Sequence, residues 1–277
     1  MPALAAARRL LGHPLFLPLY LPSLIVAFLL GMLVPILPLY AAGFEVSYGL
    51  IGLVLSGEAL GALIGDVPGG MLTRRWGMKR VMLLGVAGMA LSTVGLFRAA
   101  SVPEAIVYRL VDGFCLAAFS VSRHAYLAER VAVDKRGRAI ATLGGTYRFG
   151  RLAGPVVGGA LAANFGLRAP FLMFGLLGAA LVMLVSYGVP DDQTPPARSV
   201  PVAAAGGHRL LATVRAHYRP LMLGGSGQLF AQMIRAGWTV MIPLYGADVI
   251  GLDVGTIGLI VSLMSAADLA LFYPAGM

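Results

Sequence analysis

The chain has 277 residues, of which 58% are hydrophobic and only 12% are charged. Soluble domains carry about 25% charged residues, so this composition excludes a soluble globular protein and indicates an integral membrane protein. The formal net charge is +9, but the basic residues lie at the ends of apolar segments, so we do not expect nucleic acid as a partner. Cys115 is the single cysteine, which excludes a disulfide within the chain, and no metal-binding spacing is present.

Apolar runs of about 20 residues are typical of membrane-spanning helices. Arg8 and Arg9 precede the first run and resemble the start of a signal peptide, but the run is too long for one, so we expect an uncleaved first helix. The polar segment 190–215, rich in Pro and Gly, predicts a flexible cytoplasmic linker. The predicted helices lie near residues 15–41, 47–73, 79–97, 102–128, 138–163, 169–188, 217–246 and 253–277.

Two stretches of the chain repeat one another. Residues 242–277 align with residues 37–71 when one inserted residue is allowed. Such long-range self-similarity indicates two halves of one architecture. We therefore expect a complete six-helix transmembrane bundle over 1–189 and, over 216–277, the first two helices of an incomplete second bundle, so that the chain is C-terminally truncated. The landmarks common to both copies are Pro38/Pro243, Tyr40/Tyr245, Gly52/Gly258, Ser56/Ser262, Pro68/Pro274 and Gly70/Gly276.

Lys and Arg are distributed unevenly between the predicted loops. They gather at the N-terminus and in every second loop, whereas the other loops hold little more than Arg98 and Arg168. Because cytoplasmic loops carry the excess of positive charge, we expect a multi-pass protein of the cell membrane with a cytoplasmic N-terminus. The clustered residues include Arg74, Arg75, Lys79, Arg80, Arg130, Lys135, Arg136 and Arg138.

Three short motifs accompany the predicted helices. The loop after 47–73 combines a glycine turn with a cluster of cations at the membrane face. In the helix 102–128, Arg109 precedes Asp112 by three residues; an arginine in a membrane helix costs about 2.5–3.5 kcal/mol and needs such a partner. In the helix 138–163, glycines four residues apart accompany a proline, which suits close helix contact and a bend. The loop residues are Gly70, Arg74, Arg75, Gly77, Lys79 and Arg80, and those of the third motif are Gly150, Gly154, Pro155, Gly158 and Gly159.

These motifs resemble those of the major facilitator superfamily, and the resemblance covers the whole chain. The loop resembles G-x-L-x-D-R-x-G-x-K-R with Arg74 at the Asp position, and 109–113 resembles R-x-x-Q-G with Asp112 in place of Gln. Residues 150–159 closely match G-x-x-x-G-P-x-x-G-G, which in the superfamily marks exporters that exchange substrate for protons. The resemblance implies two six-helix bundles that rock around a midplane site, a loop that takes part in the conformational switch, and an Arg109 linked to proton transfer.

Ionisable residues inside the predicted spans are the site candidates, because such groups pair with one another or line a water-filled cavity. These residues could instead have a purely structural role, as ion pairs that hold the helices together. Glu58 is the first candidate for a protonatable carboxylate, since no acid or base lies within one helical turn of it. Because four acids balance four bases, the charges alone do not lead us to predict an anionic substrate. Arg123 and His124 lie near the end of the helix 102–128, where we expect a surface pair. The proton-coupling candidates are Glu58, Asp66, Arg109 and Asp112, the substrate-cavity candidates are Tyr147, Arg148, Arg151 and Arg235, and Asp268 is the remaining charge.

The sequence thus predicts an all-α integral membrane protein of major-facilitator type. The expected function is proton-coupled efflux of a drug or metabolite by alternating access, with the proton gradient as energy source and no cofactor, metal or enzymatic activity. The expected partners are a small-molecule substrate, protons and the lipid bilayer; a monomer is favoured. Two alternatives remain. One is a proton-coupled importer of sugars or organic acids. The other is a non-transporting membrane fragment or scaffold, whose last two helices would lack the partners that normally bury Arg235 and Asp268.

Overall fold

The computed structural model describes residues 15–190, 215 and 218–275, and every regular element in these ranges is a helix. The predicted linker 190–215 therefore lies almost entirely outside the described residues. The elements are the π-helix η1 (Phe16–Tyr20) and the α-helices α2 (Leu21–Leu33), α3 (Ile36–Ala42), α4 (Tyr48–Trp76), α5 (Met78–Arg98), α6 (Val102–Arg130), α7 (Val133–Phe165), α8 (Ala169–Gly188), α10 (Tyr218–Asp248) and α11 (Val254–Ala275). They coincide with the eight predicted spans, the first of which comprises η1, α2 and α3.

Prolines divide the first span into its three parts. Pro22 stands at the start of α2, and Pro35 separates α2 from α3. Because proline has no backbone N–H, it cannot continue the hydrogen-bond ladder of a helix. The helix is therefore locally irregular, but Phe16–Ala42 still forms one membrane-length segment, as predicted.

Five of these segments are long and apolar enough to cross a membrane by length and composition: Phe16–Ala42, α4, α5, α6 and α8. The remaining helices, α7, α10 and α11, are not both long enough and apolar enough over their described residues. Glycines and the arginines Arg148, Arg151 and Arg235 lower the mean hydropathy of α7 and α10. The sequence prediction of eight spans is thus matched by eight helical segments, of which composition alone identifies five.

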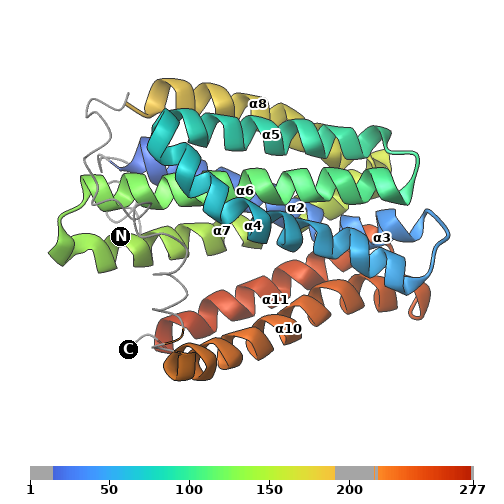
Figure 1. Ribbon diagram of the computed structural model, residues 1–277. Coiled ribbons are helices and arrows are strands. Elements are labelled where there is room, and N and C mark those ends of the chain that lie inside the picture. Colours follow the sequence, from blue (N-terminus) through green and yellow to red (C-terminus); the bar gives the residue numbers. More distant parts are fainter. Residues whose placement is uncertain (1–14, 191–214, 216–217, 276–277) are drawn as a thin grey trace, which may run out of the picture.

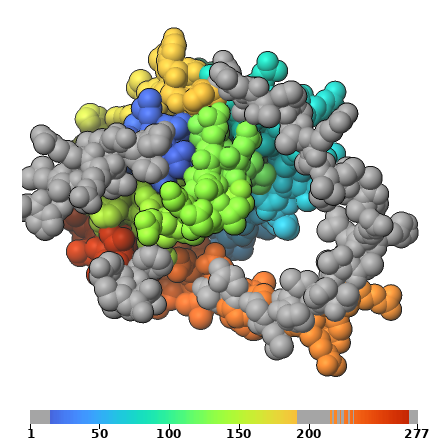
Figure 2. Space-filling model, turned by 90° about the vertical axis from the view of Figure 1, so that its left-hand side faces the viewer, coloured from blue at the N-terminus to red at the C-terminus, as the bar shows by residue number. Residues whose placement is uncertain are grey.

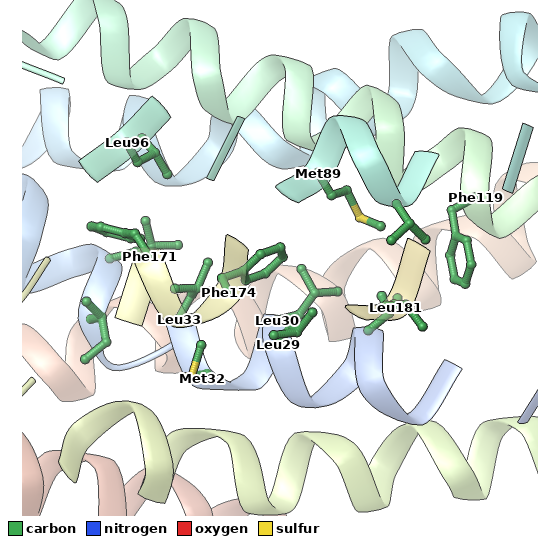
Figure 3. Close-up of a cluster of buried hydrophobic side chains, with 14 of the residues drawn as sticks. Leu29, Leu30, Met32, Leu33, Met89, Leu96, Phe119, Phe171, Phe174 and Leu181 are labelled. Carbon is green, nitrogen blue, oxygen red and sulfur yellow. The ribbon is translucent and has the colours of Figure 1, made fainter. Parts of the chain in front are cut away.

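The hydrophobic core surrounds α2. In Figure 1, α2 lies among α5, α6, α7 and α8, while α10 and α11 form a separate pair below them. Figure 3 shows Leu33 of α2 beside Phe171 and Phe174 of α8. Met32 lies instead against α7, with its Cγ 2.8 Å from a methyl group added at Gly158. The buried apolar side chains around α2 make η1 to α8 one packed body. The pair α10–α11 packs against this body through α7 and α3.

Helices α4 and α6 approach one another along a stripe of glycines on α4. Gly57, Gly61, Gly65 and Gly69 are all buried. A methyl group added at Gly65 would lie 2.9 Å from the Cα of Phe114, and one added at Gly61 would collide with the carbonyl oxygen of Leu110. The stripe therefore brings the two backbones into contact, as small residues do between membrane helices.

Gly61→Ala is expected to destabilise the fold, because the new methyl group would force α4 away from α6. Overpacking of this kind costs about 1–3 kcal/mol. Gly52→Ala, on the same helix but with open space around the added methyl group, is the matched control and should leave stability unchanged. The measurement is the free energy of unfolding of the purified protein by SDS titration; equal values for the two variants would contradict the packing argument.

Candidate functional site

An ion cluster lies between α4 and α6. The guanidinium of Arg109 uses Nη1 to donate a hydrogen bond to Asp112 Oδ2 at 2.7 Å and Nη2 to donate one to Glu58 Oε2. Arg109 and Asp112 are buried, whereas the Glu58 side chain is 30% exposed. The contact is possible because Gly57 and Gly113 lack side chains where the two helices cross. Glu58 thus has a basic partner, which its own helix does not reveal.

The cluster contains two carboxylates and one guanidinium. It therefore carries one excess negative charge when both acids are ionised, and uptake of one proton would neutralise it. Glu58 is the more accessible of the two acids, since the Asp112 side chain is 0% exposed. Arg109 therefore bridges a fully buried carboxylate on its own helix and a partly exposed one on α4.

A cavity of about 1170 Å³ lies between the six-helix body and the pair α10–α11. The substrate-cavity candidates Tyr147, Arg148, Arg151 and Arg235 all line it, as does the proton-coupling candidate Asp66. Glu58, Arg109 and Asp112 are not among the lining residues. The structure thus divides the predicted site into a buried ion cluster and a separate cavity.

The α10–α11 pair brings its own charges to the cavity. Asp268 Oδ2 lies 3.9 Å from Arg148 Nε, and Asp268 Oδ1 lies 4.0 Å from Arg235 Nη2. Arg235 and Asp268 are therefore partners of one another, although the two described helices of the second bundle do not bury them. The two side chains are 66% and 54% exposed, so the pairing is loose and open to exchange.

Arg123 and His124, which the sequence places in a surface pair, both line the cavity. Arg123 was expected at the surface, yet it is only 8% exposed and its guanidinium lies 5.5 Å from the centre of the Phe119 ring. A signal was available, because Arg123 follows Arg109 by 14 residues and thus falls on nearly the same face of α6. His124 is exposed, and its Nδ1 lies 2.7 Å from the carbonyl oxygen of Ser120.

The motif of α7 presents two separate contact faces. The backbone of α2 packs against Gly150, Gly154 and Gly158. A methyl group added at Gly154 would lie 2.6 Å from the backbone nitrogen of Met32. Helix α11 packs against Pro155 and Gly159, and a methyl group added at Gly159 would lie 3.1 Å from the Cα of Gly258. The motif therefore joins the two parts of the molecule as well as packing its own bundle.

The loop motif lies at one end of the molecule, which we name the basic end because Arg74, Arg75 and Arg80 are exposed there. Gly77 has a φ of 87°, which favours glycine, and this residue allows the chain to turn from α4 directly into α5. Lys79 follows in the first turn of α5. The structure places these motif residues together, and it places none of them in the cavity.

The cavity is closed at the end opposite the basic end. There the Tyr48 hydroxyl donates a hydrogen bond to Asp248 Oδ2 at 3.2 Å, which joins α4 to α10. Nearer the middle, Ser262 of α11 donates to the carbonyl oxygen of Leu152 at 2.8 Å. Figure 1 shows α10 and α11 spreading away from α7 toward the basic end, and Figure 2, which views that end, shows a hollow between α4 and α10. The cavity therefore opens at the basic end.

At the closed end the loop before α11 is held by a helix cap. Asp253 accepts hydrogen bonds from the Thr256 side chain at 2.5 Å and from its backbone N–H at 2.9 Å. These bonds stabilise the ionised form and lower the pKa of the Asp253 carboxyl below its usual value. They also satisfy the free N–H groups of the first turn, so α11 starts at a defined point beside α7.

Known proteins resemble this chain in sequence, and solved structures resemble it in fold. The chain is 28% identical over 174 residues to the multi-drug resistance efflux pump PmrA of Streptococcus pneumoniae, a match that covers 61% of this chain and 43% of that protein. It is 32% identical over 172 residues to the PmrA homolog of Lactococcus lactis, covering 61% and 42%. The chain thus matches less than half the length of these relatives.

Among solved structures, a D-xylose-proton symporter superposes with a TM-score of 0.63 at 18% identity, covering 91% of this chain and 66% of that one. At this identity the likeness concerns the fold alone. The family model of the Major Facilitator Superfamily matches residues 19–277. The chain therefore belongs to the Major Facilitator Superfamily, whose members are membrane transporters rather than enzymes.

Proposed function

We propose that the chain functions in proton-coupled export of small molecules by alternating access. The observation that carries the proposal is the cavity between the two parts of the molecule, open at one end and closed at the other. Two bundles that rock around such a cavity would expose it to each side of a membrane in turn. Relatives named as multidrug efflux pumps support export as the direction.

The proposed energy source is the proton gradient, with no cofactor. Glu58 is the proposed proton carrier, because it is the partly exposed acid of a cluster with one more carboxylate than cation. Protonation would release its bond to Arg109 and remove the excess negative charge. Asp66 is the second proposed carrier, since it lines the cavity eight residues further along α4.

We place the protein in the cell membrane with the basic end and the N-terminus in the cytoplasm, following the distribution of Lys and Arg. The cavity then opens toward the cytoplasm, the side from which an exporter loads its substrate. The proposed domains are a six-helix bundle over 1–189, a cytoplasmic linker over 190–215 and part of a second bundle over 216–277.

Transport by everted membrane vesicles that contain the protein tests this proposal. Respiration acidifies the vesicle lumen, so an exporter would accumulate fluorescent amphipathic compounds there, and a protonophore would abolish the accumulation. The compounds include cationic ethidium and anionic dansylglycine. Expulsion of preloaded compound on energisation would instead identify an importer, and no gradient-dependent movement of any compound would overturn the proposal.

Glu58→Gln is expected to lower gradient-driven accumulation by about tenfold or more, since coupling between sites is typically worth about 1–3 kcal/mol. Glu104→Gln makes the same chemical change at an exposed position in the first turn of α6 and retains an acceptor for the Ala100 N–H. This control should transport normally. Full gradient-driven transport by Glu58→Gln would remove Glu58 from the mechanism.

A further inference from the structure

The charges that line the cavity do not balance. Glu58 and Asp112 are bound to Arg109 outside the lining, so neither can neutralise a cation within it. Two acids remain in the lining against four arginines. With His124 neutral, the cavity carries a formal excess of two positive charges. The lining arginines are Arg123, Arg148, Arg151 and Arg235, and the acids are Asp66 and Asp268.

Arg123 is the arginine whose position most favours an anionic ligand. Arg123 is 8% exposed, and its Nε is buried without a hydrogen-bond partner. No carboxylate in the described part of the chain pairs with it, whereas Asp268 lies within 4.0 Å of both Arg148 and Arg235. A buried guanidinium is costly unless an anion or several acceptors compensate it. The Phe119 ring covers its face at 5.5 Å but supplies no hydrogen-bond acceptor.

Most of the remaining lining residues are apolar or aromatic. Trp238 and Ile242 of α10 and Leu143 of α7 are among the lining residues, together with Phe119 beside Arg123. Aromatic side chains bury large areas of a ligand and stack against its rings. A ligand that satisfies both parts of the cavity therefore combines an anionic group with an apolar, preferably aromatic, body.

We propose that the cavity binds amphipathic organic anions, with a carboxylate or sulfonate held by Arg123 and an apolar body lying against Trp238. This proposal rests on the proposed function only in that the same cavity is taken as the transport site. It departs from the balance of four acids and four bases inside the predicted spans, because Glu58, Arg109 and Asp112 lie outside the lining and Arg123 lies within it.

Binding to the purified full chain in lipid nanodiscs tests the proposal without requiring transport. The sequence has two tryptophans, so Trp76→Phe leaves Trp238 as the only donor for energy transfer to a dansyl group. Three probes carry the same fluorophore: dansylglycine is anionic, dansylamide neutral and dansylcadaverine cationic. We expect dansylglycine to bind about tenfold more tightly than dansylcadaverine, a difference of about 1.4 kcal/mol.

Arg123→Gln should weaken dansylglycine binding about tenfold and leave dansylamide binding within about twofold, since one charge-assisted hydrogen bond is lost. Unchanged dansylamide binding also shows that the variant is folded, and Arg123→Lys should retain part of the preference. Arg138→Gln removes an exposed arginine of α7 outside the cavity and should change nothing.

Equal affinity for the three probes, tighter binding of the cation, or no binding of dansylglycine would overturn the proposal. So would an Arg123→Gln variant that keeps the full preference for the anion. These outcomes are separate from those of the vesicle assay: selective binding without gradient-driven movement would contradict the transport function alone.

Discussion

Arg109→Met is expected to be the most destabilising single substitution in the ion cluster. Arg109 is buried between Glu58 and Asp112, and the Asp112 side chain is 0% exposed. Removal of the guanidinium would leave two carboxylates facing each other without compensation, which costs about 3–5 kcal/mol when one partner of a buried pair is lost. The measurement is the free energy of unfolding of the purified protein by SDS titration.

The triple variant Glu58→Gln, Arg109→Met, Asp112→Asn removes every charge of the cluster and should recover most of the loss. Arg235→Met is the matched control, because Arg235 is 66% exposed and lies 4.0 Å from Asp268. A pair of this kind contributes about 0–1 kcal/mol. If Arg109→Met proved no more destabilising than Arg235→Met, the cluster would be a loose arrangement rather than a structural element.

The sequence was sufficient to predict the helices. Long apolar runs specify membrane helices, and the glycines four residues apart in residues 150–158 predict a face for close helix contact, although not that α2 occupies it. An arginine in a span also predicts that a partner exists. Which partner it has depends on the packing of distant segments: Glu58 and Arg109 are 51 residues apart in the sequence and meet only because Gly57 allows the helices to approach.

The same limit explains the errors in the cavity. Arg123 lies near the end of the predicted helix 102–128, where a surface position is expected, but it faces the cavity beside α7 and α10 and is only 8% exposed. The contact of Asp268 with Arg148, 120 residues earlier in the sequence, likewise depends on how α11 packs beside α7. Charge balance counted over all spans could not show how charge is divided between separate sites, because that division is a property of the packed structure.

The internal repeat shows what sequence similarity leaves undetermined. Tyr40 is buried and donates a hydrogen bond to the carbonyl oxygen of Leu96 at 2.7 Å, whereas its counterpart Tyr245 is 58% exposed. Gly52 has open space around an added methyl group, whereas Gly258 lies against Pro155 and Gly159. The two copies therefore share a backbone pattern, while the helices that cover them differ. Equivalent residues acquire different roles for that reason.

A disulfide between α7 and α11 at the closed end is expected to abolish transport reversibly. A methyl group added at Gly255 would lie 3.6 Å from Ala163 Cβ, within the roughly 3.5–4.5 Å that separates the Cβ atoms of a disulfide. Ala163→Cys with Gly255→Cys, in a Cys115→Ala background, should oxidise readily. Maleimide-polyethylene glycol would then shift the mass of the protein only after reduction.

Oxidation should reduce gradient-driven accumulation in vesicles to background, and reduction should restore it, because alternating access requires the two parts to separate at this end when the cavity opens there. Gly137→Cys with Gly255→Cys is the matched control: 26 residues of α7 separate positions 137 and 163, about 39 Å at 1.5 Å per residue, which no disulfide can span. An oxidised 163–255 pair with undiminished transport would show that α7 and α11 remain together throughout the cycle. The moving boundary would then have to lie elsewhere in the molecule.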